Sequence, residues 1–428
     1  MTPYVITFVL MLGVFMVGCF ALKWPVGVSM MAAAVVGAIE GGLGTETIRM
    51  MVEGEFGYVD TILTIASAMV FMKVIEDSGG LDALSSLIIE KFHKVPAVLL
   101  ILIMFIIMFP GMITGSSTAA VLSSGSIMAP VLMLMGCDAV TAGSIIAMGG
   151  LLGMIAPPVN TAALIICAGI DVPYVGFTGP LLLLTFPLAI VVVLLLGLRK
   201  VKNLDYEKLK PALAKQDEIR KQYGFKIYLP FIALVVLMIF FKVLKLTEDL
   251  GMPVIFLLSA AVGLFTGKKI NVLKTVPEAI RTATPVMAIL MGVGMFIEVM
   301  TATGVRGLIV MTCLGLPSVL WLIVACTSIP LFGAVSSFGA CSVLGVPFAY
   351  IYASFLGGNS VVVLAAISLI ASVGDMMPPT ALAGLFAAQV TGVKKYTLIL
   401  KKCIIPIVIL LVWAAFFLAK SKLIAGLF

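Results

Sequence analysis

The stretch that decides the fold is residues 111–165, GMITGSSTAAVLSSGSIMAPVLMLMGCDAVTAGSIIAMGGLLGMIAPPVNTAALI. It contains a polar turn, Gly115–Thr118, and a proline pair, Pro157-Pro158, inside sequence that is otherwise apolar. The carboxyl-terminal half repeats this pattern with Val335–Gly339 and the pair Pro378-Pro379. At membrane depth, unpaired backbone and hydroxyl groups are costly unless they face protein, water or a bound ion. We therefore expect the four breaks to form one binding site near the middle of a membrane.

The composition predicts an all-α polytopic membrane protein. Of the 428 residues, 62% are hydrophobic and 11% are charged, whereas soluble domains carry about 25% charged residues. Residues 181–198 and 404–419 are uncharged over nearly the length of a spanning helix. The sequence lacks the short alternating segments of a transmembrane β-barrel. The net charge of +7 is interpreted as a bias of the loops, so the lipid bilayer is an expected partner and nucleic acid is not.

The sequence does not indicate an enzyme. The seven cysteines are scattered without a CxxC pair, and the single His93 lies in a short polar connection between two lysines. Paired interior carboxylates and metal-ligand sets are absent, and there is no Walker motif for ATP. A membrane enzyme or an assembly scaffold is therefore the least favoured interpretation.

The two halves of the chain share landmarks that indicate an internal duplication. The matches are Pro110 and Ser116-Ser117 with Pro330 and Ser336-Ser337 at an offset of 220, the two proline pairs at an offset of 221, and Phe71 and Gly79 with Phe296 and Gly304 at an offset of 225. Residues 1–198 are predicted to form the first repeat, with 1–94 mainly scaffold and 95–198 mainly transport. Residues 227–428 are predicted to form the second, with 227–316 mainly scaffold and 317–428 mainly transport.

The distribution of charge predicts the orientation. The connector 199–226 carries nine basic residues against four acids, which places it in the cytoplasm by the positive-inside rule. Counting crossings from it puts Lys23 inside and the acidic segments 40–55 and 247–249 outside, with both termini external. Each half then has an odd number of crossings, so the repeats are inverted. Inverted repeats with interrupted helices are typical of secondary transporters in the cell (cytoplasmic) membrane, with the site at the repeat interface.

The turn Gly115–Thr118 is predicted to be the tip of a re-entrant hairpin. The apolar arms, 96–109 and 119–134, are 14 and 16 residues long, or about 21–24 Å at about 1.5 Å per residue. A bilayer core is about 30 Å thick, so such arms fit a hairpin that ends inside the membrane. Two full spans with a Gly/Ser packing seam are the alternative.

The proline pairs predict unwound loops between half-helices. Two consecutive prolines remove two backbone donors and force the preceding residue out of the α region. The exposed carbonyl oxygens suit Na⁺, and the half-helix N-termini at Val159 and Thr380 suit an anion. Asn160, Thr161 and Thr380 add polar side chains. This combination indicates Na⁺ together with a carboxylate.

Three ionisable residues are expected at membrane depth. Asp375 lies three residues before the second proline pair, where the first half has Met154. It is interpreted as a cation ligand, a proton carrier or a cap on the broken helix. Lys73 and Glu298 are equivalent in the two repeats, and both are near helix ends, where snorkelling to the interface explains them.

The runs of residues 111–165, FMKVIEDSGGLDAL (71–84) and MMPPTALAGLF (376–386) resemble the large, DctM-like membrane subunit of TRAP transporters, within the ion transporter superfamily. The resemblance implies an elevator-type, Na⁺-driven importer of organic acids such as C4-dicarboxylates. It also implies two partners, a small four-helix membrane subunit and a substrate-binding protein outside the membrane. Monomer and homodimer both stay open.

The resemblance also implies the site. The Na⁺ ligands would be Ser116, Ser117, Pro157 and Asn160 in the first half and Ser336, Ser337, Pro378 and Thr380 in the second, with Asp375 as a further candidate. The substrate would contact Ser117, Thr118, Asn160, Thr161, Ser337 and Thr380. Three features depart from the family pattern: Val159 replaces a more usual serine, the second tip is Ser-Ser-Phe-Gly, and an acid precedes the second proline pair. Asp375 therefore points to a different coupling ion.

A stand-alone ion antiporter of the Na⁺/H⁺ type on the same fold is the main alternative. Asp375 and Glu298 would then carry protons. The related divalent-anion symporters carry Ser-Asn-Thr signatures that this sequence lacks.

Overall fold

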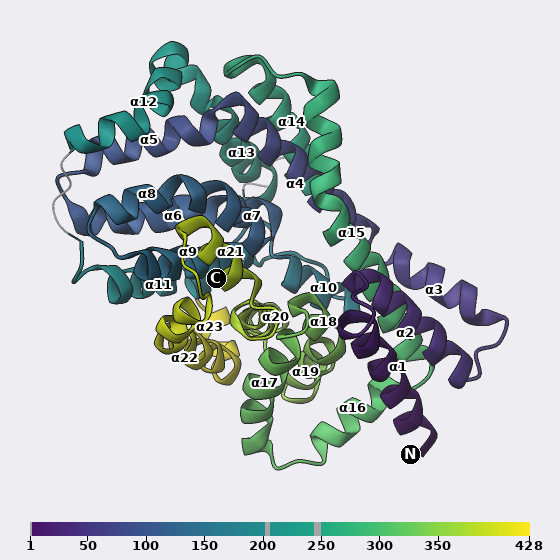
Figure 1. The fold of residues 1–428 in the computed structure, drawn as a ribbon. Coiled ribbons are helices and arrows are strands. Elements are labelled where there is room, and N and C mark those ends of the chain that lie inside the picture. The colour runs from purple at the N-terminus through teal and green to yellow at the C-terminus, as the bar shows by residue number, and fades with distance from the viewer. Residues whose placement is uncertain (1, 202–205, 244–249) are drawn as a thin grey trace.

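The structure, a computed structural model, describes residues 2–201, 206–243 and 250–428. The predicted acidic turn at 247–249 and residues 202–205 of the connector lie outside these ranges. Within them the chain is helical throughout, without strands (Figure 1). Eight helical segments of this part are long and apolar enough to cross a membrane, or up to nine if a bent pair is one span. The predicted all-α polytopic fold is confirmed.

The elements of the first half come in the predicted order. They are α1 (Thr2–Phe20), α2 (Val26–Glu40), α3 (Glu46–Phe56), α4 (Val59–Ser78), α5 (Gly80–Phe92), α6 (Pro96–Thr114), α7 (Ser117–Ala120), η1 (Val121–Gly125), α8 (Ser126–Leu134), α9 (Ala139–Ile155), α10 (Thr161–Gly169) and α11 (Thr178–Gly197). The connector contains α12 (Tyr206–Tyr223) and leads into η2 (Gly224–Tyr228).

The second half has a matching series. Its elements are α13 (Leu229–Met238), η3 (Ile239–Val243), α14 (Gly251–Thr266), α15 (Val272–Ala302), α16 (Val305–Leu314), α17 (Ser318–Gly333), α18 (Ser337–Ala340), η4 (Cys341–Gly345), α19 (Val346–Tyr350), η5 (Ile351–Phe355), α20 (Ser360–Ser372), η6 (Val373–Met376), α21 (Leu382–Thr391), α22 (Thr397–Ala419) and α23 (Ser421–Ala425). Both proline pairs interrupt a helix as predicted, because α9 ends before Pro157 and α10 begins after it, and η6 and α21 flank Pro378 in the same way.

One group of helices packs around α15. Figure 1 shows this long helix beside α2, α3 and α4, and α14 packs against α4. Small residues allow the contact, since a Cβ on Gly292 would meet the carbonyl oxygen of Gly27 at 2.4 Å, and one on Gly294 that of Gly54 at 2.2 Å. Close backbone approach through small residues is the usual way in which helices associate in a membrane.

Two boundaries in this group differ from what the sequence suggests. The acidic segment 40–57 suggests a polar connection, but residues Glu46–Phe56 form α3. This helix packs along α15, with a close backbone approach at Gly54. The apolar segment 284–303 suggests a span, and it is the end of the 31-residue α15, which continues through Pro277 and Pro285.

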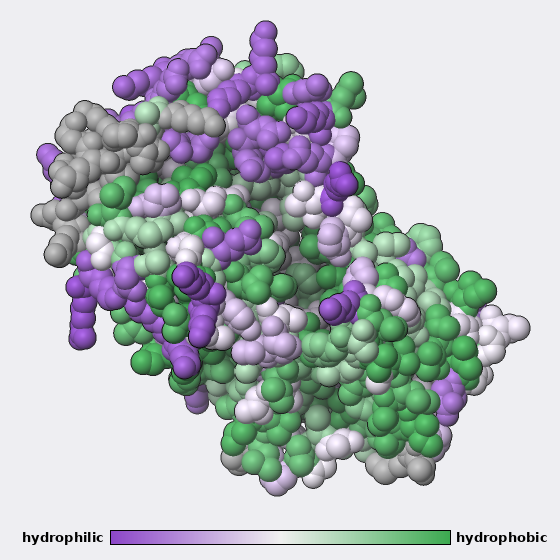
Figure 2. Space-filling model, viewed as in Figure 1, coloured by the Kyte–Doolittle hydropathy of each residue, from purple (hydrophilic) through white to green (hydrophobic). Residues whose placement is uncertain are grey.

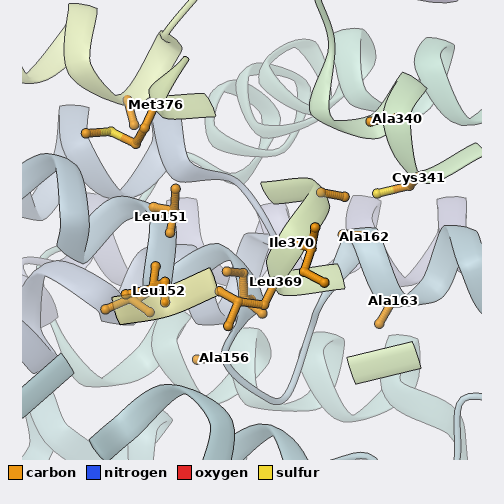
Figure 3. Close-up of a cluster of buried hydrophobic side chains, with 14 of the residues drawn as sticks. Leu151, Leu152, Ala156, Ala162, Ala163, Ala340, Cys341, Leu369, Ile370 and Met376 are labelled. Atoms are coloured by element: carbon orange, nitrogen blue, oxygen red, sulfur yellow. The ribbon is translucent and has the colours of Figure 1, made fainter. Parts of the chain in front are cut away.

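A second group of helices surrounds α20. This helix packs against α10, α17 and α22, while α9 packs against α6, α11, α21 and α22. Figure 3 shows the interior of the group, where Leu151 and Leu152 of α9 lie near Leu369 and Ile370 of α20. These four side chains are fully buried. Helices from both halves therefore share one apolar core, and the division into scaffold and transport parts stays a prediction.

The connector helix α12 packs along α5. Ser86 of α5 donates a hydrogen bond to Asp217 of α12, and Arg220 pairs with Glu90. Figure 2 shows hydrophilic side chains gathered at this end of the molecule, around α12 and α5 in Figure 1, and apolar side chains over much of the remaining face.

The hairpin arms are longer than predicted. The first arm, α6, continues through Pro110 to Thr114 and has 19 residues. The second runs from Ser117 to Leu134 over 18 residues, so each measures about 27–28 Å at about 1.5 Å per residue. The argument from short arms is therefore wrong. The arms do fold back on each other near the tip, where α6 packs against α7 and η1, and the re-entrant hairpin stays a prediction.

Candidate functional site

The two hairpin tips have the same local structure. Ser116 caps α7, accepting a hydrogen bond from the Ala119 amide at 3.3 Å, and Ser336 caps α18, accepting one from the Gly339 amide at 3.1 Å. A π-helical turn follows each cap, η1 in the first half and η4 in the second. A side-chain oxygen at an N-cap satisfies a backbone donor that the helix cannot. The serines therefore let the chain turn inside apolar surroundings.

Each tip is attached to the broken helix of its own half. The Val159 amide donates to the Met112 carbonyl at 3.1 Å, and the Thr380 hydroxyl donates to the Ala334 carbonyl at 2.8 Å. Gly115 has φ +62°, and a Cβ there would lie 2.0 Å from the Thr161 hydroxyl oxygen. Only glycine fits this position, because it tolerates positive φ and brings no side chain.

Asp375 connects the two tips. Its side chain is 4% exposed, and its carboxylate accepts a hydrogen bond from the Ser117 hydroxyl of the first tip at 2.5 Å. The Ser337 side chain of the second tip interacts with Asp375 and lines the same cavity. In the described part of the chain, the elements packed most closely on η6 are α9, α17, α18, α20 and α21, and Ser117 belongs to α7. The sequences of these six elements contain no charged residue. Asp375 is therefore a buried carboxylate held by neutral donors.

The two tips, η6 and the helices α2, α4 and α15 line a cavity of about 560 Å³. One wall consists of Val26 of α2 together with residues of α4 and α15, and the other consists of the tips, Met154 and Asp375. Hydroxyl groups are frequent on the lining, which includes Thr114, Ser116, Ser117, Thr118, Ser123, Thr282, Ser336, Ser337 and Thr380. A pocket of this size with convergent polar groups has the dimensions of a small-molecule site.

Seven of the eleven site residues predicted from the sequence line the cavity. Those on the lining are Ser116, Ser117, Thr118, Ser336, Ser337, Asp375 and Thr380. The other four, Pro157, Asn160, Thr161 and Pro378, are not on it. Their predicted ligand roles stay predictions.

Asn160 stabilises the loop that follows Pro157-Pro158. It is fully buried, and its amide nitrogen donates to the Ile155 carbonyl at 3.0 Å and to the Ser368 hydroxyl at 2.8 Å. Its oxygen accepts the Ala163 amide at 2.9 Å and so caps α10. These three bonds fix the loop after Pro157 against α20. Asn160 therefore has a positioning role in this structure.

The sequence interpretation missed the charged pair on α4. Lys73 and Glu76 both line the cavity, with Met69 and Met72 on the same helix face. The spacing of three and four residues that places them together was readable in the sequence, but Lys73 was interpreted as snorkelling. Its repeat counterpart Glu298 is not on the lining.

An all-helical membrane protein whose two broken helices and two capped tips converge on one cavity has the architecture of secondary transporters. A family model described as "Tripartite ATP-independent periplasmic transporter, DctM component" matches residues 12–421. The chain belongs to this family, and the resemblance seen in the sequence is confirmed. It is thus the large membrane component of a TRAP-type secondary transporter, a multi-pass membrane protein of a transporter family rather than an enzyme family.

The fold is similar to that of a solved transporter. The crystal structure of the Alcanivorax borkumensis YdaH transporter, described as having an unusual topology, matches with a TM-score of 0.60. The match covers 89% of this chain and 88% of that one at 15% identity, so it supports the fold alone. No curated protein matches the chain.

Proposed function

We propose that this chain carries an organic anion into the cell by secondary active transport coupled to Na⁺. The observation that carries the proposal is the buried Asp375, which meets Ser117 of one tip and Ser337 of the other. A buried carboxylate without a cationic side chain on the elements around it favours a bound cation. Carboxylate and hydroxyl oxygens suit a hard ion such as Na⁺.

The anion fits the remaining lining. Thr118 and Thr380 present hydroxyls to the cavity beside the cation ligands, and hydroxyls donate hydrogen bonds to a carboxylate. A C4-dicarboxylate or another small carboxylate is the substrate class that follows from the family. A Na⁺ bound next to the substrate would add the attraction that links the two binding events.

The packing supports an elevator mechanism. Both tips and Asp375 belong to the helices that pack around α20 and α9, whereas α2, α4 and α15 form the other wall. Movement of the first group past the second would carry the site across the membrane. The basic connector 199–226 would stay in the cytoplasm and both termini outside.

Partners complete the proposed system. The large components of this family generally act with a small membrane subunit and a substrate-binding protein. We propose that this chain does the same in the cell membrane. The small subunit would bind the outer surface, and the binding protein would deliver the anion to the cavity from outside.

Proteoliposomes that contain the full chain with its companion subunits would test the function. Uptake of radiolabelled carboxylates is measured with an inward Na⁺ gradient, and choline replaces Na⁺ in the control. Accumulation that requires Na⁺ supports the proposal. Accumulation with choline in place of Na⁺ contradicts the coupling.

Asp375 also favours the alternative of an ion antiporter, because a buried carboxylate can exchange a proton for Na⁺. The same vesicles distinguish the two functions. Na⁺ flux that is driven by a pH gradient, without any organic substrate, would replace our proposal by the antiporter.

A further inference from the structure

The charges on the cavity lining are few and unequal. Among the described residues that line it, only Lys73, Glu76 and Asp375 are charged, which amounts to one basic and two acidic side chains. If a coupling Na⁺ neutralises Asp375, the remaining charged groups are Lys73 and Glu76. The cavity then contains a single positively charged side chain for a substrate.

Lys73 is held at the cavity by weak ion pairs. Its ammonium group is 3.3 Å from Asp77, 3.4 Å from Glu278 of α15 and 3.7 Å from Glu76. The Lys73 side chain is 20% exposed, whereas those of Glu76 and Glu278 are each 49% exposed. Ion pairs with half-exposed carboxylates contribute little free energy. A substrate carboxylate can therefore take the place of one of them.

A second carboxylate on the substrate has no such partner. Away from Lys73 it would meet the neutral hydroxyls of the tips, Asp375 with its bound Na⁺, and the negative charge of Glu76. A carboxylate that came within about 7 Å of Glu76, at an effective dielectric of about 20, would be repelled strongly enough to weaken binding by roughly 10- to 100-fold. The lining thus discriminates by charge number as well as by size.

We infer that the transported anion carries one carboxylate, bound by Lys73, and an uncharged body that faces the hydroxyls of the two tips. This inference rests on the proposed transport function and narrows its substrate class. Dicarboxylates, which the family resemblance suggests, are then poor ligands of this chain. Lys73 becomes the residue that determines this specificity.

Matched probes test the inference by calorimetry on the purified full-length chain in lipid nanodiscs. Succinate is compared with succinamate, and adipate with adipamate, so that each pair differs only by one carboxylate. We expect the monoamides to bind at least about tenfold more tightly in NaCl. Equal or tighter binding of the dicarboxylates would overturn the inference.

Variants assign the effect to Lys73. Lys73→Gln is expected to remove the preference and weaken monoamide binding about tenfold, whereas Lys73→Arg retains it. Glu76→Gln is expected to improve dicarboxylate binding, because one repelling charge is gone. Lys94→Gln, at an exposed position between α5 and α6, is the control and changes nothing. Wild-type binding by Lys73→Gln would refute the role of Lys73.

The two proposals fail in different ways. Na⁺-dependent binding of the dicarboxylates that is at least as tight as that of the monoamides overturns the inference and leaves the transport function standing. If Na⁺ changes the binding of neither member of either pair, the proposed Na⁺ coupling itself is wrong. The unfolding temperature of each variant, measured beside wild type, separates a loss of binding from a loss of fold.

Discussion

Replacing Asp375 by asparagine removes the one charge that both tips share and keeps the size of the side chain. The carboxylate is 4% exposed and 2.5 Å from the Ser117 hydroxyl oxygen. A Na⁺ that touches both groups would therefore lie within about 4 Å of the charge. At that separation and an effective dielectric of about 20, the attraction amounts to about 4 kcal/mol.

Part of this attraction is already offset in the native protein. Burying the ionised carboxylate is costly when no cation is bound, and asparagine avoids that cost. We therefore expect Asp375→Asn to lose about 2 kcal/mol of Na⁺ binding, which corresponds to a rise of roughly 30-fold in the half-saturating Na⁺ concentration. Folding should change little, because an amide can still bond the hydroxyls of Ser117 and Ser337.

The assay is a titration of thermal stability with NaCl on the purified chain, with choline chloride at each concentration to hold the ionic strength constant. Met154→Leu is the matched control, since Met154 is the repeat counterpart of Asp375 and lines the same cavity. Met154→Leu should keep the wild-type Na⁺ dependence. If Asp375→Asn has the same half-saturating Na⁺ concentration as wild type, Asp375 is not a Na⁺ ligand and the reasoning is refuted.

Three further substitutions test the scaffold of the site. Gly115→Ala should destabilise the protein by at least about 2 kcal/mol, because a Cβ at φ +62° would lie 2.0 Å from the Thr161 hydroxyl; equal unfolding temperatures would contradict this. Asn160→Ala should lower the free energy of unfolding by about 2–3 kcal/mol, because it removes the cap of α10 and the hydrogen bond to Ser368. The Na⁺ concentration at half-saturation should not change. A change in that concentration would support Asn160 as a Na⁺ ligand. Asp138→Ala should lower the free energy of unfolding, measured with a chemical denaturant, by about 1 kcal/mol, because the N-cap of α9 is lost. Asp138→Ser should retain most of this stability, since serine is also a good N-cap.

The Asp138 contribution also has a predictable pH dependence. Burial opposes ionisation, but hydrogen bonds from Lys200 and Thr141 outweigh it and hold the pKa of Asp138 well below its usual range. A lowered folded-state pKa stabilises the protein above the unfolded-state value and loses its effect as pH falls through the folded-state value. Between pH 5 and 8 the difference in unfolding free energy between Asp138→Ala and wild type should therefore be constant. A difference that grows across this range would contradict the assignment.

The breaks could be predicted from sequence because each rests on a local rule. Two consecutive prolines interrupt a helix, so the loop at Pro157 follows from neighbouring residues alone. Serine is a favoured N-cap residue, which agrees with the caps at Ser116 and Ser336. The all-α membrane fold follows from composition in the same way. Helix α3 did not follow, because it packs on α15, a helix more than 200 residues later in the chain, with a close approach at Gly54.

The site was harder to predict because side-chain direction depends on tertiary packing. Asn160 and Ser117 are both polar residues at a break, but only Ser117 faces the cavity. Asn160 turns to Ser368, a residue of the other half that no local pattern connects to it. The position of Lys73 on the lining could not be predicted for the same reason, since it depends on how α4 packs against α15.

The asymmetry between Asp375 and Met154 has a physical cause in the way the halves meet. If each half carried its own carboxylate, both would face one cavity, and two buried like charges a few ångströms apart would repel by several kcal/mol. A single carboxylate avoids this repulsion and still contacts the first half, because the Ser117 hydroxyl of the first tip donates a hydrogen bond to Asp375 of the second half. The two tips thus contribute neutral hydroxyl groups in pairs, while the charge is contributed once. The two half-sites are therefore coupled through Asp375, and a cation bound there would tie the two tips together.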